Sequence, residues 1–266
     1  SNRLSKGIEF LMKKNKITHI SGTGKVISKT SIEVKNGRKT ETVEASNIII
    51  ATGARPRTFP GMELDGKRVI SYKEAMVLDA PPKKMIIIGS GAIGSEFAYY
   101  YNEFGTEIHM VEMMDSLLPV EDADVSKEVE KSFKKSGIKV STSTKVLKIE
   151  SLKTKVKVHT QTNGKEAILE GDVALLAVGV TGNIENIGLE DLGLKTDRGS
   201  IIINEYNQTN FQNIYAIGDV SGPPWLAHVA SAQGHLASDH IAGYSPKPVD
   251  YSNIPGCTYC HPQVGS

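Results

Sequence analysis

The chain has 266 residues, of which 31 are basic and 30 acidic, so its formal net charge is +1. This length suits about two domains of roughly 150 residues each, and the lack of a basic patch argues against nucleic-acid binding. The longest apolar run, near residues 173–178, is far shorter than the ~20 residues of a membrane span. Two cysteines and no leader pattern at the start predict a cytoplasmic protein with no membrane partner.

The first 45 residues predict a helix followed by a small antiparallel meander. Leu4, Ile8, Leu11 and Met12 share one helical face within residues 4–15, and the pattern is typical of a helix whose beginning is missing. Asn-Gly at residues 36–37 is a strong hairpin signal. The strands expected in this stretch are 17–20, 25–27, 31–34 and 40–45.

Residues 48–56 read Ile-Ile-Ile-Ala-Thr-Gly-Ala-Arg-Pro. The apolar start predicts a buried strand, and the small residues and glycine after it would let the backbone approach a ligand closely. The alternative is a plain strand end before a proline-marked loop.

Residues 84–112 contain the strongest motif of the chain. An apolar strand over 85–88 leads into Gly-Ser-Gly-Ala-Ile-Gly at 89–94, a helix over 95–104 and a second strand over 108–111. In such a unit Gly89 takes the tight turn, Gly91 lets the backbone approach a pyrophosphate, and Gly94 allows close packing of helix and strand. The first helical turn then offers N–H groups to the phosphates. This order predicts dinucleotide binding, the alternative being a glycine turn in an ordinary α/β unit.

An acid follows the second strand of this motif. Glu112 lies 18 residues after Gly94, close to the ~20 residues at which a carboxylate binds the adenosine ribose hydroxyls. A carboxylate in this place would repel a 2′-phosphate, so the sequence favours NAD over NADP.

The stretch after Glu112 predicts a helix, a second meander and a return to the parallel sheet. The helix is expected over 124–136, with Asp124 as N-cap and Gly137 just past its end. Leu175 to Gly179 predict a buried strand beside the dinucleotide site. Strands are expected at 138–141, 144–150, 155–160 and 166–170, with a hairpin turn at 163–164.

A third strand of the same buried type is predicted at residues 214–219. It ends in Gly-Asp, and Asp219 would lie at a carboxyl end, where α/β sheets bind ligands; the alternative is an Asp that caps a turn. A helix is expected over 226–241. Its histidines at 228, 235 and 240 lack the i, i+4 spacing of metal ligands, so no metal site is predicted.

Residues 257–261 read Cys-Thr-Tyr-Cys-His, which matches the pattern of haem attachment, half a zinc site or a redox pair. Each alternative fails on context. Haem attachment requires export, zinc requires four ligands, and a redox pair requires a following helix, whereas Pro262 comes directly after the motif. A short strand between proline turns is the prediction.

Four of these segments together resemble one family. They are 50–53, 89–112, 214–219 and 254–264, and the chain resembles the flavin-dependent pyridine nucleotide-disulfide reductases over essentially its whole length. Residues 180–183, 226–228 and 254–264 make it similar to the branch that oxidises dihydrolipoyl groups in 2-oxo-acid dehydrogenase complexes. The rivals are a reductase of the mercuric or glutathione type, a stand-alone NAD-binding module and a haem carrier.

The resemblance implies two sets of cofactor-binding residues and no catalytic residue. The residues matching NAD contacts are Gly89, Ser90, Gly91, Ala92, Ile93, Gly94, Ser95, Glu96, Glu112, Val146 and Gly179. The residues matching FAD contacts are Gly22, Thr52, Gly53, Ala54, Asp219, Trp225, Leu226, Ala227 and His228.

The resemblance also implies the domain plan. The fold class is α/β, with a Rossmann-like NAD-binding domain of parallel sheet and antiparallel meander over 80–203. Residues 1–79 and 204–254 would be parts of an FAD-binding domain, and 255–266 the start of a dimer-interface domain. The family's first G-x-G-x-x-G unit, its redox C-x-x-x-x-C pair and its catalytic His-Glu pair are not in the chain. The chain is therefore expected to bind NAD(H) without turnover, with an incomplete FAD site. The parent protein would be a homodimer that acts on a lipoyl domain.

Overall fold

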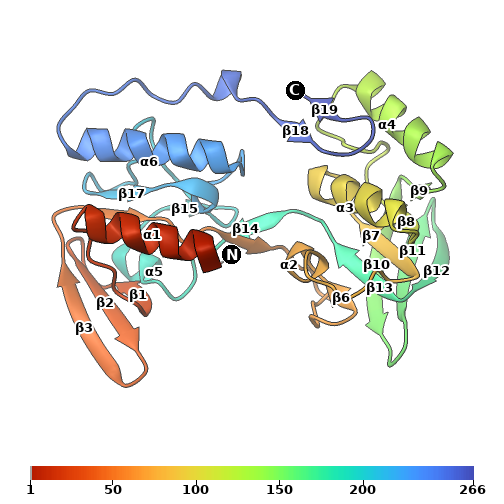
Figure 1. Ribbon diagram of the computed structural model, residues 1–266, viewed down its shortest axis with the longest axis horizontal. Helices are drawn as coiled ribbons and strands as arrows, with labels where there is room; N and C mark the ends of the chain where they lie inside the picture. The colour runs from red at the N-terminus through yellow and green to blue at the C-terminus, as the bar shows by residue number, and fades with distance from the viewer. Residues whose placement is uncertain (1) are drawn as a thin grey trace. The chain divides into compact units, whose positions relative to one another are not determined.

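The computed structural model describes residues 2–266 and resolves into two compact units (Figure 1). Unit 1 comprises residues up to Ala54 together with 182–249, and unit 2 comprises 55–181 together with 250–266. The chain passes between the units within β5 (Ala54–Pro56) and β14 (Val180–Gly182), and again after residue 249. The predicted α/β fold is confirmed, with parallel pairing in both units.

The centre of unit 2 is a five-stranded parallel sheet. Its strands lie in the order β6, β13, β7, β8 and β9. Their bounds are Val69–Ile70 for β6, Lys84–Ile88 for β7, Glu107–Val111 for β8, Lys139–Ser141 for β9 and Val173–Leu176 for β13. The expectation that the strand before Gly179 returns to this sheet is confirmed, because β13 pairs directly with β7.

Strand β7 is buried on both faces, as its apolar run predicts. Side chains alternate between the faces of a strand, so Met85 and Ile87 pack in one cluster with the helix residues Ala98 and Phe133. Ile86 and Ile88 pack in another cluster with residues of the second meander. The sheet is therefore covered by helices on one face and by antiparallel strands on the other.

The helices of unit 2 are α2 (Tyr72–Ala75), α3 (Ala92–Glu103) and α4 (Ala123–Lys135). Helix α3 follows the glycine turn and begins earlier than the expected residue 95. The N-cap of α4 is Asp122 and not Asp124: the Asp122 side chain accepts the N–H of Asp124, which lies in the first turn. Both residues are acidic, and only the backbone path decides which one precedes the helix. Gly137 follows the helix with a φ of 90°, as predicted.

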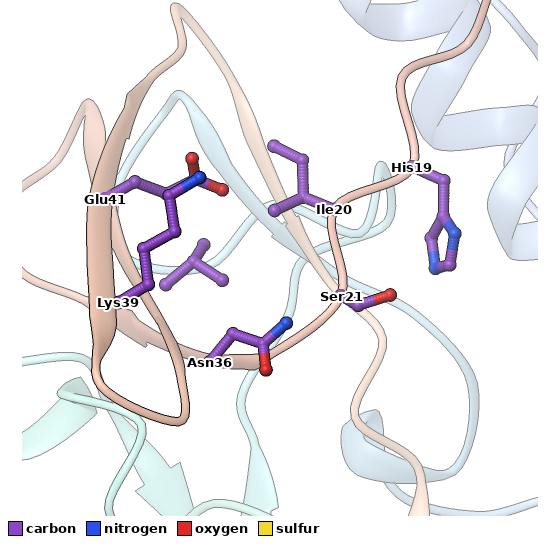
Figure 2. A pocket seen from close by; sticks show the side chains of 7 residues that line it. His19, Ile20, Ser21, Asn36, Lys39 and Glu41 are labelled. Carbon is purple, nitrogen blue, oxygen red and sulfur yellow. The ribbon is translucent and has the colours of Figure 1, made fainter.

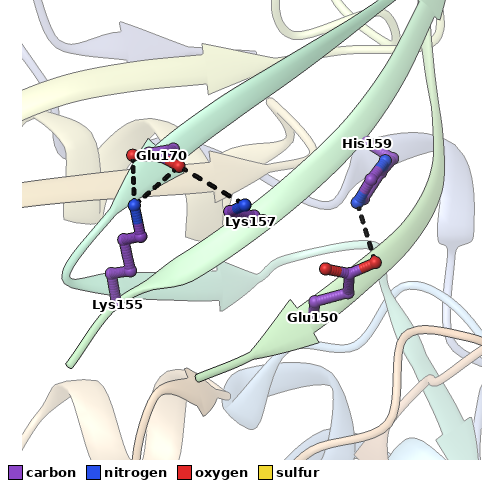
Figure 3. A network of polar contacts seen from close by, with 5 residues as sticks. All are labelled: Glu150, Lys155, Lys157, His159 and Glu170. Atoms are coloured by element: carbon purple, nitrogen blue, oxygen red, sulfur yellow. Dashed lines mark hydrogen bonds and ion pairs between the residues drawn. The ribbon is translucent and has the colours of Figure 1, made fainter. Parts of the chain in front are cut away.

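The second meander consists of β10 (Thr144–Ser151), β11 (Val156–Thr162) and β12 (Lys165–Gly171). Figure 3 shows ion pairs across it, in which Glu170 contacts Lys155 and Lys157, and Glu150 lies 3.1 Å from His159 Nε2. The hydrogen bond from Lys155 is the main cause that lowers the pKa of Glu170. The lysine and glutamate side chains are solvated, and exposed ion pairs contribute little to stability.

Unit 1 contains helix α1 (Asn2–Lys14), the predicted first meander and two helical segments within residues 218–241. The meander strands are β1 (Thr23–Val26), β2 (Ser31–Asn36) and β3 (Lys39–Glu44), and the helical segments are η1 (Gly218–Ser221) and α6 (Ala227–Ile241). Helix α1 is present as expected, although Leu4, Ile8 and Leu11 on its apolar face are exposed.

The prediction of a strand over residues 17–20 is wrong. These residues carry no strand pairing, and Ile17 and Ile20 are exposed. A strand requires a neighbour that accepts and donates its backbone hydrogen bonds, and no segment of residues 2–266 pairs with this one.

The parallel sheet of unit 1 has two strands, β4 (Ile48–Ile50) and β17 (Ile214–Ala216). A core of Ile48, Ile50, Ile214 and Ala216, joined by Ile201, lies around it. The remaining short elements are α5 (Leu189–Leu192), β15 (Thr196–Asp197) and β16 (Ser200–Ile201) in unit 1, and η2 (Tyr251–Asn253), β18 (Cys257–Thr258) and β19 (Val264–Gly265) in unit 2. No helix within residues 2–266 has the length and apolar content needed to cross a membrane.

Candidate functional site

The candidate site of unit 2 lies where the order of its parallel strands reverses. From β7 the chain continues to β8 and β9 on one side, whereas β13 lies on the other side of β7. In open α/β sheets ligands bind outside the carboxyl ends of the strands at such a switch point. Gly89 directly follows β7, and Gly179 follows shortly after β13.

Two glycines of the turn are required by the packing of the protein itself. Gly89 has a φ of 96°, and a Cβ there would lie 2.4 Å from the carbonyl oxygen of Ala177. A Cβ on Gly94 would lie 2.0 Å from the carbonyl oxygen of Gly89. Both approaches are closer than real Cβ contacts, so the turn closes against β13 and against its own helix only with glycine in these places.

Gly91 differs from both, because nothing in the protein requires it. Its φ is −64°, and a Cβ there would meet no atom within 4 Å. It is the N-cap of α3 and makes no side-chain cap, and the first helical bond runs from Ser95 N to its carbonyl oxygen over 3.0 Å. The N–H groups of the first turn have no acceptor inside the helix. The open space at Gly91 and these donors together fit a phosphate group.

Glu112 lies immediately after β8 and is only 8% exposed. Its Oε2 accepts both the N–H and the hydroxyl of Ser90 over 2.8 Å, and its Oε1 accepts the N–H of Met114 over 2.8 Å. A carboxylate has about four lone-pair sites, so three are used within the protein and one remains unused. The structure thus ties the predicted ribose acid to the predicted phosphate turn.

The other residues matched to NAD have different surroundings. Ser95 is buried, and its hydroxyl donates to the carbonyl oxygen of Ser90. Glu96 accepts the N–H of Tyr259 with its Oε1. Val146 is 6% exposed and packs in the core, so only its backbone could meet a ligand, whereas Gly179 has a φ of 94° and open space around it. Ala92 is exposed and Ile93 half-buried in the first turn of α3.

In unit 1 the parallel pairing of β4 and β17 places the turn after β4 and the segment after β17 at the same edge of the sheet. Thr52 and Asn183 exchange two hydrogen bonds, from Thr52 Oγ1 to the Asn183 carbonyl and from Asn183 Nδ2 to the Thr52 carbonyl. Asn183 N also donates to the carbonyl oxygen of Gly53. The turn 52–54 is therefore fixed from 183, while Gly53, with a φ of 68°, meets no atom within 4 Å of its Cβ position.

Asp219 lies in η1, three residues after the end of β17 at Ala216, so the strand is shorter than the 214–219 expected. Its carboxylate makes no hydrogen bond or ion pair with any of residues 2–266. Gln233, which is 3% exposed, fixes the segment: its Oε1 accepts the N–H of Gly218 over 2.6 Å, and its Nε2 donates to Ser221 Oγ over 3.4 Å. Sequence reasoning missed Gln233, although an amide on the buried face of a helix was a usable signal.

The remaining residues matched to FAD are exposed or explained by packing. Trp225 is 41% exposed, Leu226 is the N-cap of α6, and Ala227 and His228 are exposed in its first turn. Gly22 has a φ of 155°, and a Cβ there would lie 2.7 Å from Val34 Cγ1 and 2.8 Å from the Lys35 carbonyl oxygen.

The hollow next to Gly22 contains none of the other residues matched to FAD. It has a volume of about 220 Å³, and Figure 2 shows the side chains that line it. They are His19, Ile20, Ser21, Val34, Asn36, Lys39 and Glu41.

The cysteines lie in unit 2, where the predicted short strand is confirmed as β18. Cys257 is exposed, and Cys260 is buried with its Sγ donating to the Pro262 carbonyl oxygen. Burial raises the pKa of the Cys260 thiol, which makes it a poorer nucleophile. Residues 2–266 contain no group of three or more His, Cys, Asp or Glu side chains placed to hold a metal ion.

Comparison with known proteins agrees with this geometry. Residues 1–234 match the family described as pyridine nucleotide-disulphide oxidoreductase. A dihydrolipoyl dehydrogenase of Rhizobium etli is 47% identical over all of this chain and 59% of its own length, and one of Zymomonas mobilis is 44% identical over all of this chain and 58% of its own length. The crystal structure of LpdA from Mycobacterium tuberculosis matches 99% of this chain and 59% of its own, with a TM-score of 0.91 and 30% identity.

The chain thus spans less than two thirds of the relatives that it matches, while the match covers the chain from one end to the other. The family implies FAD and NAD(H) as cofactors, and the two edges described above lie in separate units of the chain. On the profile match and the relatives together, the chain belongs to the pyridine nucleotide-disulphide oxidoreductase family.

Proposed function

We propose that this chain binds NAD(H) at the glycine turn of unit 2. The observation that carries the proposal is Gly91, the one glycine of the turn whose missing side chain serves no packing in the protein. It stands at the start of α3 beside Glu112, which keeps one acceptor site for a ribose hydroxyl. The phosphates would bind the N–H groups of the first turn, and Glu112 would repel a 2′-phosphate. NAD is therefore the expected dinucleotide, which disfavours relatives that use NADP.

The test is isothermal titration calorimetry with NADH on the whole chain and on Gly91→Ala. The new methyl group meets no protein atom, so the variant should fold normally, while its Cβ occupies the space proposed for the phosphates. We expect NADH affinity to fall at least tenfold, a loss of about 1.4 kcal/mol or more. Glu103→Gln, at the far end of the same helix, is the matched control and should bind like the wild type. Equal NADH affinity in Gly91→Ala and wild type would contradict the assignment.

We further propose that the parent protein oxidises dihydrolipoyl groups with NAD⁺, as a homodimer acting on the lipoyl domain of a 2-oxo-acid dehydrogenase complex. The support is the likeness to dihydrolipoyl dehydrogenases along the whole chain. FAD, when bound, would carry the electron pair between the dithiol and NAD⁺. In this chain Thr52 to Ala54 and Asp219 would hold part of it, and the unpaired Asp219 carboxylate fits a ribityl hydroxyl.

The chain alone is expected to lack this turnover. Its only cysteines are Cys257, which is exposed, and Cys260, whose thiol is buried against the Pro262 carbonyl. Both belong to unit 2, and unit 1, which contains the edge with Asp219, includes no cysteine. Disulfide exchange requires a thiolate that reaches its partner, and no such pair is encoded at the proposed flavin edge.

The second test is the purified chain with dihydrolipoamide, NAD⁺ and added FAD. We expect a colourless protein after gel filtration and no NADH formation above background. The Cys257→Ser/Cys260→Ser double variant is the matched control, and it should retain the NADH affinity of the wild type. A yellow protein with stoichiometric FAD, or turnover that the double variant abolishes, would refute this part of the proposal without affecting the NADH site.

A further inference from the structure

We infer that Ser90 is a positioning residue that holds the Glu112 carboxylate in place and thereby determines how strongly the site prefers NADH to NADPH. The inference rests on the proposed NAD(H) site and deepens it. Ser90 is the middle residue of Gly89-Ser90-Gly91, and sequence reasoning grouped it with the residues that contact the pyrophosphate. The structure gives its side chain a different surrounding.

The side chain of Ser90 faces into the protein. The residue is fully buried, and its hydroxyl donates to Glu112 Oε2 over 2.8 Å. Its own N–H donates to the same oxygen over 2.8 Å. A hydroxyl that is buried and engaged in this way is not available to a phosphate, so its contribution to nucleotide binding passes through the carboxylate.

Ser90 is itself held from the other side. Its carbonyl oxygen accepts the hydroxyl of Ser95 over 3.0 Å and the N–H of Leu118 over 3.1 Å. The residue is therefore fixed by α3 and by the segment after β8, and it cannot follow the carboxylate if Glu112 moves. The two bonds to Oε2 consequently anchor Glu112 to a rigid part of the turn.

This anchoring has a consequence for nucleotide choice. A glutamate with a single contact could rotate away when a 2′-phosphate enters the site. Glu112 would have to give up three charge-assisted hydrogen bonds to do so, and such bonds are about twice as strong as neutral ones. The negative charge of Glu112 therefore stays where the ribose binds. A dianionic 2′-phosphate would lie close to this charge, and at short range in a buried site water cannot fully screen the repulsion between them.

The alternative is that Ser90 is merely a small residue that fits a buried turn. Alanine would then serve equally well, because it lacks only the hydroxyl. The two interpretations differ in one measurable quantity, the ratio of the NADPH and NADH dissociation constants.

The experiment measures both dissociation constants by calorimetry for wild type, Ser90→Ala, Glu112→Gln and the double variant. In Ser90→Ala we expect NADH to bind about tenfold more weakly, the scale of one charge-assisted hydrogen bond. NADPH should be affected less or should gain, so the ratio of the constants narrows. In the Glu112→Gln background, removal of the Ser90 hydroxyl should change neither constant further, because the residue acts through the carboxylate.

Controls keep the outcomes distinct. Thr106→Val removes a different buried hydroxyl, which donates to the Pro82 carbonyl oxygen over 2.7 Å before the start of β8, and should leave both constants unchanged. Ser90→Gly removes the same hydroxyl as Ser90→Ala, and it is used in place of Ser90→Ala if Ser90→Ala does not fold. An unchanged ratio in folded Ser90 variants, or an equal effect of Ser90→Ala in the Glu112→Gln background, overturns the inference. Absence of NADH binding in the wild type would instead contradict the proposed function.

Discussion

Strands β7 and β4 have the same local sequence pattern and different environments. Each contains three consecutive isoleucines and leads into a turn with glycine. In β7, Ile86, Ile87 and Ile88 are at most 4% exposed, and the strand pairs on both edges. In β4, Ile49 is 40% exposed, and among residues 2–266 the strand pairs only with β17.

The turn after β7 is also more tightly fixed by contacts within the protein than the turn after β4. Gly89 is pressed against the backbone of Ala177, and the acid beside it has three hydrogen bonds within the protein. Gly53 has open space around it, and Asp219 at its edge has no partner within the described chain. The comparison shows that the pattern of a buried strand and a glycine turn specifies the local backbone. The neighbouring strands decide whether the site is internally fixed before a ligand arrives.

The largest predicted difference between the two turns is the loss of stability when one of their glycines is replaced by alanine. Gly94→Ala drives a methyl group into the Gly89 carbonyl, and we expect the free energy of unfolding of unit 2 to fall by about 3 kcal/mol or more. In Gly53→Ala the new methyl group contacts no atom, and only the positive φ is unfavourable for alanine. We expect the free energy of unfolding of unit 1 to fall by about 1–2 kcal/mol. Urea unfolding followed by circular dichroism measures both. Equal losses would mean that the turns are equally constrained.

The next difference concerns the two acids. Glu112→Ala leaves the buried N–H and hydroxyl of Ser90 without their acceptor, so we expect it to destabilise the nucleotide-free protein by about 1–3 kcal/mol. Asp219→Ala removes a carboxylate with no partner in the chain and should change stability by less than about 0.5 kcal/mol. Thermal unfolding without nucleotide distinguishes them. A comparable loss in Asp219→Ala would show that unit 1 also depends on its acid.

The smallest difference is a pH effect within unit 2. Burial opposes the ionisation of Asp65, but hydrogen bonds from Ser151 and from the N–H groups of residues 67–69 outweigh it and lower its pKa from 3.8 to about 2. The resulting stabilisation is complete above pH 3.8 and is lost as pH falls through about 2. Because the side chain is largely exposed, Asp65→Asn should cost only about 1 kcal/mol at neutral pH.

Urea unfolding of wild type and Asp65→Asn over this pH range checks the prediction. The two unfolding midpoints should converge as pH falls from about 4 to about 2, the range set by the shifted pKa. A difference that persists at the acid end would mean that the loop before β6 depends on the shape of the side chain and not on its charge.

Local patterns of the sequence predicted the elements that form through near neighbours. The shared apolar face of residues 4–12 predicted α1, Asn-Gly at 36–37 predicted a hairpin, and the strand, turn, helix and strand of 84–112 all appear in the structure. Such features depend on backbone preferences and hydrophobic periodicity within one segment. For the same reason residues 17–20 were predicted as a strand: their composition favours one, but a strand also requires a partner.

The sequence by itself therefore determined the α/β class, the glycine turn and the placement of an acid at the end of the next strand. Only the tertiary structure decided what those groups contact. Whether Val146 faces the core, whether Gln233 fixes the segment with Asp219, and whether Ser90 faces a phosphate or Glu112 depend on residues distant in the chain. Hydrogen bonds act over about 3 Å, and such proximity between distant segments arises only when the sheet order and the packing of its faces bring them together.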